Sequence, residues 1–436
     1  MASSSMLSQD ATNPLVQIAS FPRLIRILYD MYFELLDHYE IIKNYIGTNE
    51  VDAVSLTAFF PENGLYLSHY FKCPTILLSP IGPVPHFSHY FGNPENPSYM
   101  PDTRMPFIEP MNFRARFFNT LYYIFLDILN IQQRLMGHVL SSNQLMEYEE
   151  FIQSYQKMSL LLENSHFVTH NSQAKVANTV NIGGIHCREG RPLPQDLSNF
   201  LDQAKSGAIY VSFGSVIKSS LMSKEKLDSF LETFRQIQYP IIWKWDADQI
   251  PNLPANVMLK KWLPQQDLLA HPNLKVFVTH GGLFSLQEAI YHNTPLVGIP
   301  LGTDQKPNLM RAQQRGYALM LDWQSLNASI FTEAINKVMH DPSFANNMNT
   351  ARKQFIDQKE TPLERGIWWI EYVIRHKGAQ FLKPQSLKLA FYQYHLLDVI
   401  SLLVLIAIIS SITFIILLKC CCKLWCSRSS TKQKVQ

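Results

Sequence analysis

The chain has 436 residues, of which 47% are hydrophobic and 17% are charged. This length suggests two or three domains, and the composition allows large hydrophobic cores. The formal net charge of +3 is too small to argue for a nucleic-acid partner. Four of the six cysteines lie between positions 420 and 426, so a disulfide scaffold is excluded, although one bridge between Cys73 and Cys187 stays open.

Short apolar runs and longer amphipathic segments alternate along most of the chain. Short runs bounded by glycine or proline predict strands, and apolar residues at helical spacing predict helices. The strands predicted before residue 250 cover 51–60, 74–78, 165–170, 180–184, 208–212 and 240–245. The helices predicted in the same part cover 15–46, 64–71, 113–140 and 223–237. The apolar 113–140 segment suits a core helix, the wall of an apolar pocket or a membrane contact.

The stretch from 275 to 308 has the most polar residues next to predicted strands. Residues 275–280 predict a buried strand, 283–291 a helix and 295–300 a second strand. Open parallel sheets bind ligands beyond the carboxyl ends of their strands. We therefore expect one cluster there, formed by His280, Ser285, Glu288, Asp304, Gln305 and Asn308.

The residue types in this stretch indicate a nucleotide. Free N–H groups at a helix start led by Gly281 and Gly282 suit a diphosphate. The carboxylate of Glu288 can accept hydrogen bonds from a vicinal diol such as ribose. Any one position alone is better explained as a turn or a solvated residue, but six together favour a ligand site.

A second group lies upstream at Trp262 and Gln265. A uracil ring needs a flat apolar platform and an amide that both donates and accepts, and these two side chains supply them. Taken alone, a tryptophan at the end of a strand is more often part of the core. Asp267 is expected to cap the short helix that follows, through residue 270.

Together these motifs resemble the signature of the membrane-bound UDP-glycosyltransferases, the UDP-glucuronosyltransferase family. In that signature a strand ends in His-Gly-Gly, a serine and Glu-Ala follow along a helix, two prolines flank the next strand, and Asp-Gln precedes an asparagine. The matching positions are His280-Gly281-Gly282, Ser285, Glu288-Ala289, Pro295, Pro300, Asp304-Gln305 and Asn308. The resemblance covers nearly the whole chain, including its C-terminal end.

The resemblance implies an α/β fold of GT-B type, with two Rossmann-like doubly wound domains, the first incomplete, and a C-terminal transmembrane helix. It implies an acceptor-binding N-terminal domain at 1–184, a linker at 185–200 and a UDP-sugar-binding C-terminal domain at 201–375. A juxtamembrane segment would follow at 376–398, a transmembrane helix at 399–418 and a basic cytoplasmic tail at 419–436. The helix at 362–376 would cross back onto the first domain.

The implied activity is transfer of a hexose or hexuronic acid from a UDP-sugar to the hydroxyl of a small lipophilic acceptor, with inversion. The UDP-sugar is a co-substrate, and no metal or other cofactor is expected. Trp262, Gln265 and Glu288 would hold uridine, and Asp304 and Gln305 the sugar. The full implied donor set is Ser215, Trp262, Gln265, His280, Gly281, Gly282, Ser285, Glu288, Asp304 and Gln305.

The catalytic base is not assigned. In the family, a histidine near the N-terminus deprotonates the acceptor and an aspartate orients it. This sequence has no matching histidine, Thr57 occupies the aspartate position, and Asp52 and Glu62 lie before and after it. Two hypotheses follow: an enzyme whose N-terminal part lies outside this sequence, or a shortened, non-catalytic member that binds donor or pairs with full-length enzymes as a regulator.

Residues 399–418 carry no charge and are long enough to cross the hydrocarbon core of a bilayer. The basic tail favours the cytoplasmic side, residues 1–10 show no signal-peptide pattern, and the sequon at Asn327 fits a luminal body. The expected setting is the endoplasmic reticulum membrane, crossed once, with the body in the lumen. Expected partners are the UDP-sugar, the acceptor, the membrane and homo- or hetero-oligomers with related enzymes, but no nucleic acid.

Overall fold

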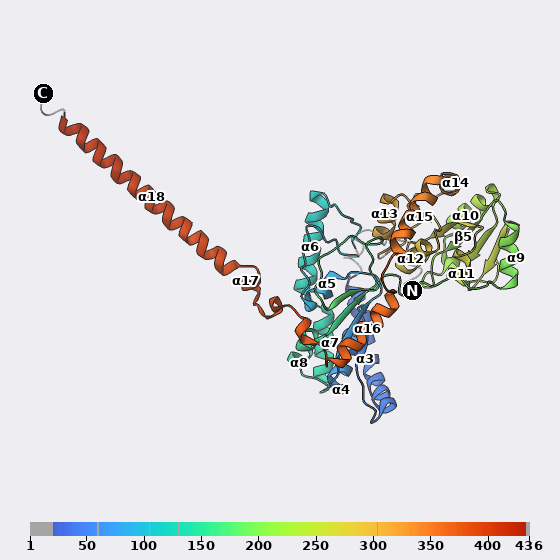
Figure 1. The fold of residues 1–436 in the computed structure, drawn as a ribbon, viewed down its shortest axis with the longest axis horizontal. Helices are drawn as coiled ribbons and strands as arrows, with labels where there is room; N and C mark the ends of the chain where they lie inside the picture. Colours follow the sequence, from blue (N-terminus) through green and yellow to red (C-terminus); the bar gives the residue numbers. More distant parts are fainter. Residues whose placement is uncertain (1–20, 59–60, 104, 130, 303, 433–436) are drawn as a thin grey trace. The chain divides into compact units, whose positions relative to one another are not determined.

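The computed structural model describes residues 21–58, 61–103, 105–129, 131–302 and 304–432. It divides into two compact units, Met1–Leu382 and Lys383–Gln436. In the first unit, helices pack around two sheets, and every pairing between described strands is parallel (Figure 1). The predicted α/β class with parallel sheets is therefore confirmed.

The first sheet has four strands in the order β1-β2-β3-β4. Their bounds are β1 (Val54–Thr57), β2 (Thr75–Ser79), β3 (Leu160–Glu163) and β4 (Thr179–Asn181). The helices of this part are α3 (Phe21–Ile46), α4 (Glu62–Phe71), α5 (Pro85–Ser88), η1 (His89–Phe91), α6 (Phe113–Leu129), α7 (Ile131–Ser142) and α8 (Tyr148–Lys157). Phe151 and Tyr155 of α8 are fully buried in the same cluster as Leu77 and Leu161, so α8 covers one face of the sheet.

The second sheet has six strands in the order β10-β9-β8-β5-β6-β7. Their bounds are β5 (Ala208–Ser212), β6 (Ile241–Lys244), β7 (Val257–Lys260), β8 (Leu274–Thr279), β9 (Leu296–Gly298) and β10 (Ala318–Met320). The helices from here to the end of the first unit are α9 (Gln195–Gln203), η2 (Ser219–Leu221), α10 (Lys224–Gln236), α11 (Gln265–Leu269), α12 (Leu283–Tyr291), α13 (Gln305–Gln314), α14 (Ala328–His340), α15 (Pro342–Ile356), α16 (Pro362–Arg375) and η3 (Gln380–Leu382).

Both faces of the second sheet are buried, because alternate residues of its central strands enter two separate cores. On β5, Ile209 and Val211 join a core with Trp243, whereas Ala208 and Tyr210 join the opposite core. The opposite core also contains Leu286 of α12. A sheet covered in this way leaves its carboxyl edge as the place where polar residues can gather.

Helix α16 returns to the first sheet, as the resemblance implied. Its Val373 is fully buried with Leu160 of β3 and Ile182, just after β4. The helix begins with a capping box formed by Thr361 and Glu364, with a proline in its first turn. These local signals explain why the helix starts at Pro362.

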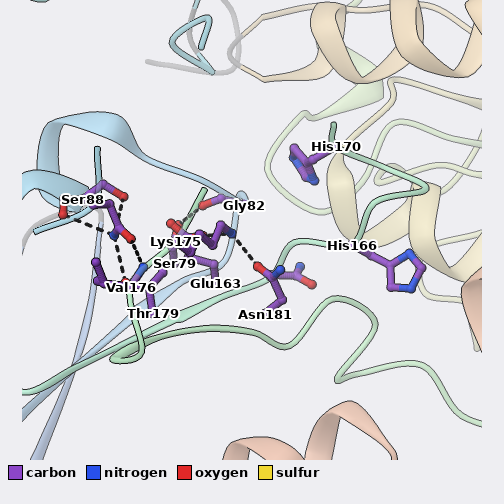
Figure 2. A network of polar contacts seen from close by, with 12 residues as sticks. Ser79, Gly82, Ser88, Glu163, His166, His170, Lys175, Val176, Thr179 and Asn181 are labelled. Carbon is purple, nitrogen blue, oxygen red and sulfur yellow. Dashed lines mark hydrogen bonds and ion pairs between the residues drawn. The ribbon is translucent and has the colours of Figure 1, made fainter. Parts of the chain in front are cut away.

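One predicted element is wrong. Residues 165–170 form a turn and not a strand (Figure 2), because the His166 carbonyl accepts the backbone N–H groups of Thr169 and His170 and the Thr169 hydroxyl. Such local bonds compete with a strand ladder, and the strand lies earlier, at β3. The helix predicted at 113–140 agrees with α6 and α7, which lie on either side of residue 130, a position outside the described residues.

The second unit contains η4 (Gln385–Lys388), α17 (Phe391–Tyr394) and α18 (Leu397–Lys432). Among the described residues, one helical segment is long and apolar enough to cross a membrane, Leu397–Cys422, with a mean hydropathy of 2.9. The predicted span at 399–418 lies within it. This finding rests on length and composition.

Candidate functional site

Glycines in the turns after β5 and β8 lie very close to two side chains, Leu309 and His280. Gly281 has a φ of +86°, and a Cβ there would lie 2.4 Å from Leu309 Cγ. Added Cβ atoms on Gly214 and Gly282 would lie 2.9 Å from His280 Cε1 and 2.7 Å from His280 Nε2. The His280 ring is therefore packed between two glycines, and only glycine leaves this space open.

Burial controls the charge of His280. Together with the nearby Lys244 ammonium, it lowers the pKa of the imidazole to about 4. Nδ1 is buried without a hydrogen-bond partner in the described part of the chain. His280 is consequently neutral at pH 7, so it can offer a phosphate a hydrogen bond but not a positive charge.

The positive charge near this turn comes from Lys244. Its Nζ donates to the Gly214 carbonyl at 2.9 Å and lies 4.7 Å from the centroid of the Trp262 ring. Trp262 is 76% exposed, which excludes the reading of this residue as part of the core. The indole therefore has a free surface on which a flat ring could stack. Ser215 is exposed in the turn after β5, next to Gly214.

Gln265, Ser285 and Glu288 meet between α11 and α12. The Gln265 Nε2 donates to Ser285 Oγ at 3.0 Å and to Glu288 Oε2 at 2.5 Å. The Gln265 Oε1 accepts from the Tyr210 hydroxyl at 3.0 Å. In this structure the amide is engaged on both sides by protein groups, so it orients Glu288. Its expected contact with uracil stays a prediction.

Glu288 is 8% exposed, and its burial raises the pKa of the carboxyl to about 7, against the lowering effect of the Gln265 bond and Arg188. Its Oε1 lies 3.7 Å from His186 Nε2. Burial lowers the pKa of His186 to about 4, so that imidazole is neutral at pH 7 and the contact is not an ion pair. Glu288 therefore titrates near neutral pH, so a bound ligand could change the protonation state of its carboxyl.

The start of α13 forms the other side of the site. Asn308 Nδ2 donates to Asp304 Oδ2 at 2.8 Å and to the Gly281 carbonyl at 3.2 Å, which ties α13 to the glycine turn. Gln305 Oε1 accepts the backbone N–H groups of Leu301 and Gly302 at 2.8 and 3.0 Å. Its Nε2 therefore remains as the polar atom that could donate to a sugar hydroxyl.

Asp267 forms an ion pair with Arg188 that the sequence does not predict. The N-cap of α11 is Pro264, and Asp267 instead accepts from Arg188 Nη1 and Nη2 at 2.6 and 3.1 Å and from the Arg191 backbone N–H at 2.8 Å. The expected helix cap is therefore wrong. The carboxylate anchors the predicted linker against α11, a role that lacks a sequence signal because the partners are far apart in the chain.

Replacing Asp267 with alanine is expected to lower the stability by about 1.5–3 kcal/mol, because the Arg188 guanidinium and a backbone N–H lose their acceptor. Thermal unfolding would show this as a lower Tm. The matched control is Asp248→Ala, since the pair of Asp248 with Lys261 is exposed on both sides. Equal Tm values for the two variants would contradict the anchoring role.

The three positions considered for the carboxylate, Thr57, Asp52 and Glu62, have different surroundings in and beside β1. Thr57 ends β1 with an exposed side chain, and Asp52 precedes the opposite end of that strand. Glu62 is fully buried and accepts from the Tyr155 hydroxyl at 2.8 Å, and burial raises its pKa to about 7. Among the described residues, no group of three or more histidine, cysteine or acidic side chains could hold a metal ion.

The titration of Glu288 predicts a pH-dependent affinity for uridine. An ionised carboxylate accepts stronger hydrogen bonds from a diol than the protonated acid does. With a pKa of about 7 in the free protein, affinity should rise roughly three- to tenfold from pH 5.5 to pH 8. Calorimetry with uridine avoids phosphate titration. Glu288→Gln should flatten the profile, and an unchanged slope in that variant would assign the titration to another group.

Comparison with known proteins identifies the family. A family model described as UDP-glucoronosyl and UDP-glucosyl transferase matches residues 9–435. UDP-glycosyltransferase UGT5 of Dactylopius coccus is 32% identical over 377 residues, covering 83% of this chain and 69% of the relative. UDP-glucuronosyltransferase 2B7 of Homo sapiens is 31% identical over 379 residues, covering 86% and 70%. UDP-glucuronosyltransferase 2B16 of Oryctolagus cuniculus is 34% identical over 340 residues, covering 74% and 61%.

Solved structures agree on the fold. The glycotransferase of kitacinnamycin has a TM-score of 0.56 at 17% identity, covering 80% of this chain and 82% of that chain. CalG4, the calicheamicin glycosyltransferase, has a TM-score of 0.51 at 15% identity, covering 82% and 84%. These likenesses show the GT-B fold, and the relatives favour a transferase over a non-catalytic protein. The chain therefore belongs to the UDP-glucoronosyl and UDP-glucosyl transferase family and is a UDP-sugar glycosyltransferase.

Proposed function

We propose that this transferase moves a hexose or hexuronic acid from a UDP-sugar to the hydroxyl of a small lipophilic acceptor, with inversion at the anomeric carbon. One observation carries the proposal. An exposed aromatic platform at Trp262, a buried carboxylate at Glu288 and the glycine turn after β8 gather at one edge of the second sheet. These are the groups that a uracil, a ribose and a diphosphate need.

The chain's own residues would act mainly on the leaving group. The acceptor oxygen bonds to the anomeric carbon as the bond from that carbon to the UDP oxygen breaks, and UDP leaves with the electron pair. The N–H groups at the start of α12, the neutral His280 and the Lys244 ammonium would stabilise the growing charge on the diphosphate. The acceptor proton passes to a base.

Asp304 and Gln305 would hold the sugar of the donor. Both are nearly buried at the start of α13, and Asn308 fixes Asp304 while two backbone N–H groups fix Gln305. A carboxylate beside an amide donor suits two neighbouring hydroxyls. Because hexoses and hexuronic acids share those hydroxyls, this pair supports both donors.

Transfer assays with the 436-residue chain test the proposal. UDP-glucose and UDP-glucuronic acid are each incubated with a lipophilic phenol, and the anomeric configuration of the product is read by NMR. We expect UDP release and a β-linked product from the α-linked donor. An α-linked product would contradict inversion. Calorimetric binding of UDP without any product would instead support the non-catalytic alternative.

We also propose that the protein spans the endoplasmic reticulum membrane once, with the body in the lumen and the basic tail in the cytoplasm. Support comes from the apolar helix Leu397–Cys422 and from the exposed sequon at Asn327. Asn327 caps α14 through a bond from the Ile330 N–H at 3.0 Å. Ser329→Ala removes the sequon and keeps this cap. A luminal body predicts endoglycosidase sensitivity in the natural chain and none in this variant, whereas insensitivity of both would contradict a glycosylated luminal body.

A further inference from the structure

The apolar helix of the second unit carries a run of cysteines at the end of its apolar part. Helix α18 is continuous from Leu397 to Lys432, and its apolar part is Leu397–Cys422. Cys420, Cys421 and Cys422 follow one another there, and all three are free and exposed. Four of the six cysteines of the chain lie between positions 420 and 426. Most of the thiols are therefore gathered at one end of this helix.

The depth of these cysteines follows from the length of the uncharged run. Residues 399–418 carry no charge, and at about 1.5 Å per residue this helical stretch is about 30 Å long. The hydrocarbon core of a bilayer is also about 30 Å thick. Lys419 is the first charged residue after the run. In a chain that spans the membrane as proposed above, the three thiols therefore lie just outside the hydrocarbon core.

Helix geometry keeps the three thiols apart. Consecutive residues of an α-helix are about 100° apart around its axis, so three neighbouring side chains point in three different directions. They cannot converge on one metal ion. In the part of the chain that the structure describes, no group of three or more histidine, cysteine or acidic side chains could hold one. Each thiol is instead exposed separately, so a group that modifies one of them leaves the others accessible.

The two cysteines of the first unit have different surroundings. Cys73 and Cys187 are half-buried, and burial raises the pKa of both thiols. A cysteine reacts as its thiolate, so a raised pKa makes these two thiols less reactive. The three neighbouring cysteines of α18 are exposed instead. Exposure therefore favours the cysteines of α18 over those of the first unit as sites of modification.

We propose that Cys420, Cys421 and Cys422 form a site of S-acylation, at which a long fatty acyl chain is attached to at least one of these thiols. Cysteines beside a membrane span are typical positions for this modification. The acyl donor is a long-chain acyl-coenzyme A. The cysteine Sγ bonds to the acyl carbonyl carbon as the bond from that carbon to the coenzyme A sulfur breaks. The thiol proton passes to the released sulfur, and nothing is oxidised or reduced.

The thioester would place an apolar chain where it can enter the bilayer. An acyl chain attached just outside the hydrocarbon core can fold back into it, and each methylene that it buries adds to the affinity for the membrane. The basic tail would then be held close to the membrane surface. The proposal rests on the proposed topology, since the thiols must lie on the side of the membrane that holds the cytoplasmic acyl donor.

The test expresses the full chain in cells supplied with an alkyne analogue of palmitate, and a fluorescent reporter is then attached to the alkyne of the purified protein. We expect the natural chain to carry label and neutral hydroxylamine to release it, because hydroxylamine cleaves thioesters but not amides. The triple variant Cys420→Ser, Cys421→Ser, Cys422→Ser should lose most of the label. Two single variants are controls that should keep it, Cys426→Ser in the same tail and Cys73→Ser in the first unit.

Endoglycosidase digestion of the same samples keeps this proposal separate from the topology on which it rests. A sensitive chain without label would overturn the acylation and leave the luminal body standing, whereas an insensitive chain without label would contradict both. Label that resists hydroxylamine, or label that survives in the triple variant, would also overturn the proposal. So would a disulfide-linked dimer that forms through these cysteines in place of the label, because it would assign them to contact between two copies of the chain.

Discussion

Gly281→Ala is expected to lower the stability by roughly 2–4 kcal/mol and to abolish UDP binding. The new Cβ would lie 2.4 Å from Leu309 Cγ. The backbone φ of +86° is also one that residues other than glycine rarely adopt. Leu309 is fully buried and already fills the space beside Gly298, so it cannot move aside. Thermal unfolding should show a Tm lower by roughly 6–12 °C, and calorimetry should show no UDP binding.

Gly366→Ala is the matched control for Gly281. An added Cβ there would make ordinary contacts of 3.6 Å with Ile182 Cγ2 and Ile185 Cδ1, and the residue lies inside helix α16. Alanine in a helix interior is favoured over glycine by about 0.5–1 kcal/mol, so Tm should hold or rise. If Gly281→Ala kept the natural Tm and UDP affinity, the predicted clash between the new Cβ and Leu309 would be contradicted.

Glu288→Ala is expected to weaken UDP binding by about 1–3 kcal/mol, a factor of roughly 5 to 150 in Kd, because the ribose loses its charged acceptor. Calorimetry at pH 8 measures this, since the carboxyl is then largely ionised. Glu189→Ala is the control. Glu189 is exposed and accepts from the hydroxyl of Tyr291, the last residue of α12. Unchanged UDP affinity in Glu288→Ala would remove this residue from the site.

We do not expect weaker UDP binding by Glu288→Ala at pH 8 to result from a loss of folding stability. The folded pKa of Glu288, about 7, lies above the ordinary glutamate value of 4.5. The folded protein therefore binds this proton more tightly than the unfolded chain. The resulting stabilisation is fully present below pH 4.5 and is lost as the pH rises through 7. At pH 8 this proton-linked stabilisation is absent from the natural chain, so we expect Glu288→Ala to change Tm little.

Elements with strong local signals were predictable. The strand predicted at 208–212 and the helix predicted at 283–291 agree with β5 and α12, because apolar periodicity and flanking glycines fix both ends. The prediction at 165–170 failed because the His166 and Thr169 side chains bond locally to backbone and favour a turn over a strand. Apolar character alone could not reveal this competition.

The candidate donor site was predictable as a set of positions but not as a set of contacts. Its residues stand beside strand ends, where parallel sheets gather polar groups, so their neighbourhood follows from the sequence pattern. The pattern does not show that the Gln265 amide is engaged by Tyr210, Ser285 and Glu288. It also does not show that Asp267 holds the linker, since that contact joins distant segments.

The amino-acid sequence alone predicts the family, the parallel α/β architecture, the apolar C-terminal helix and the glycine turn after β8. Each depends on residue order within a short window, where periodicity and backbone freedom act directly. The neutral state of His280, the raised pKa of Glu288 and the ion pair of Asp267 with Arg188 depend instead on tertiary contacts. Burial and pairing set these properties, and both depend on side chains that folding brings together from distant parts of the chain.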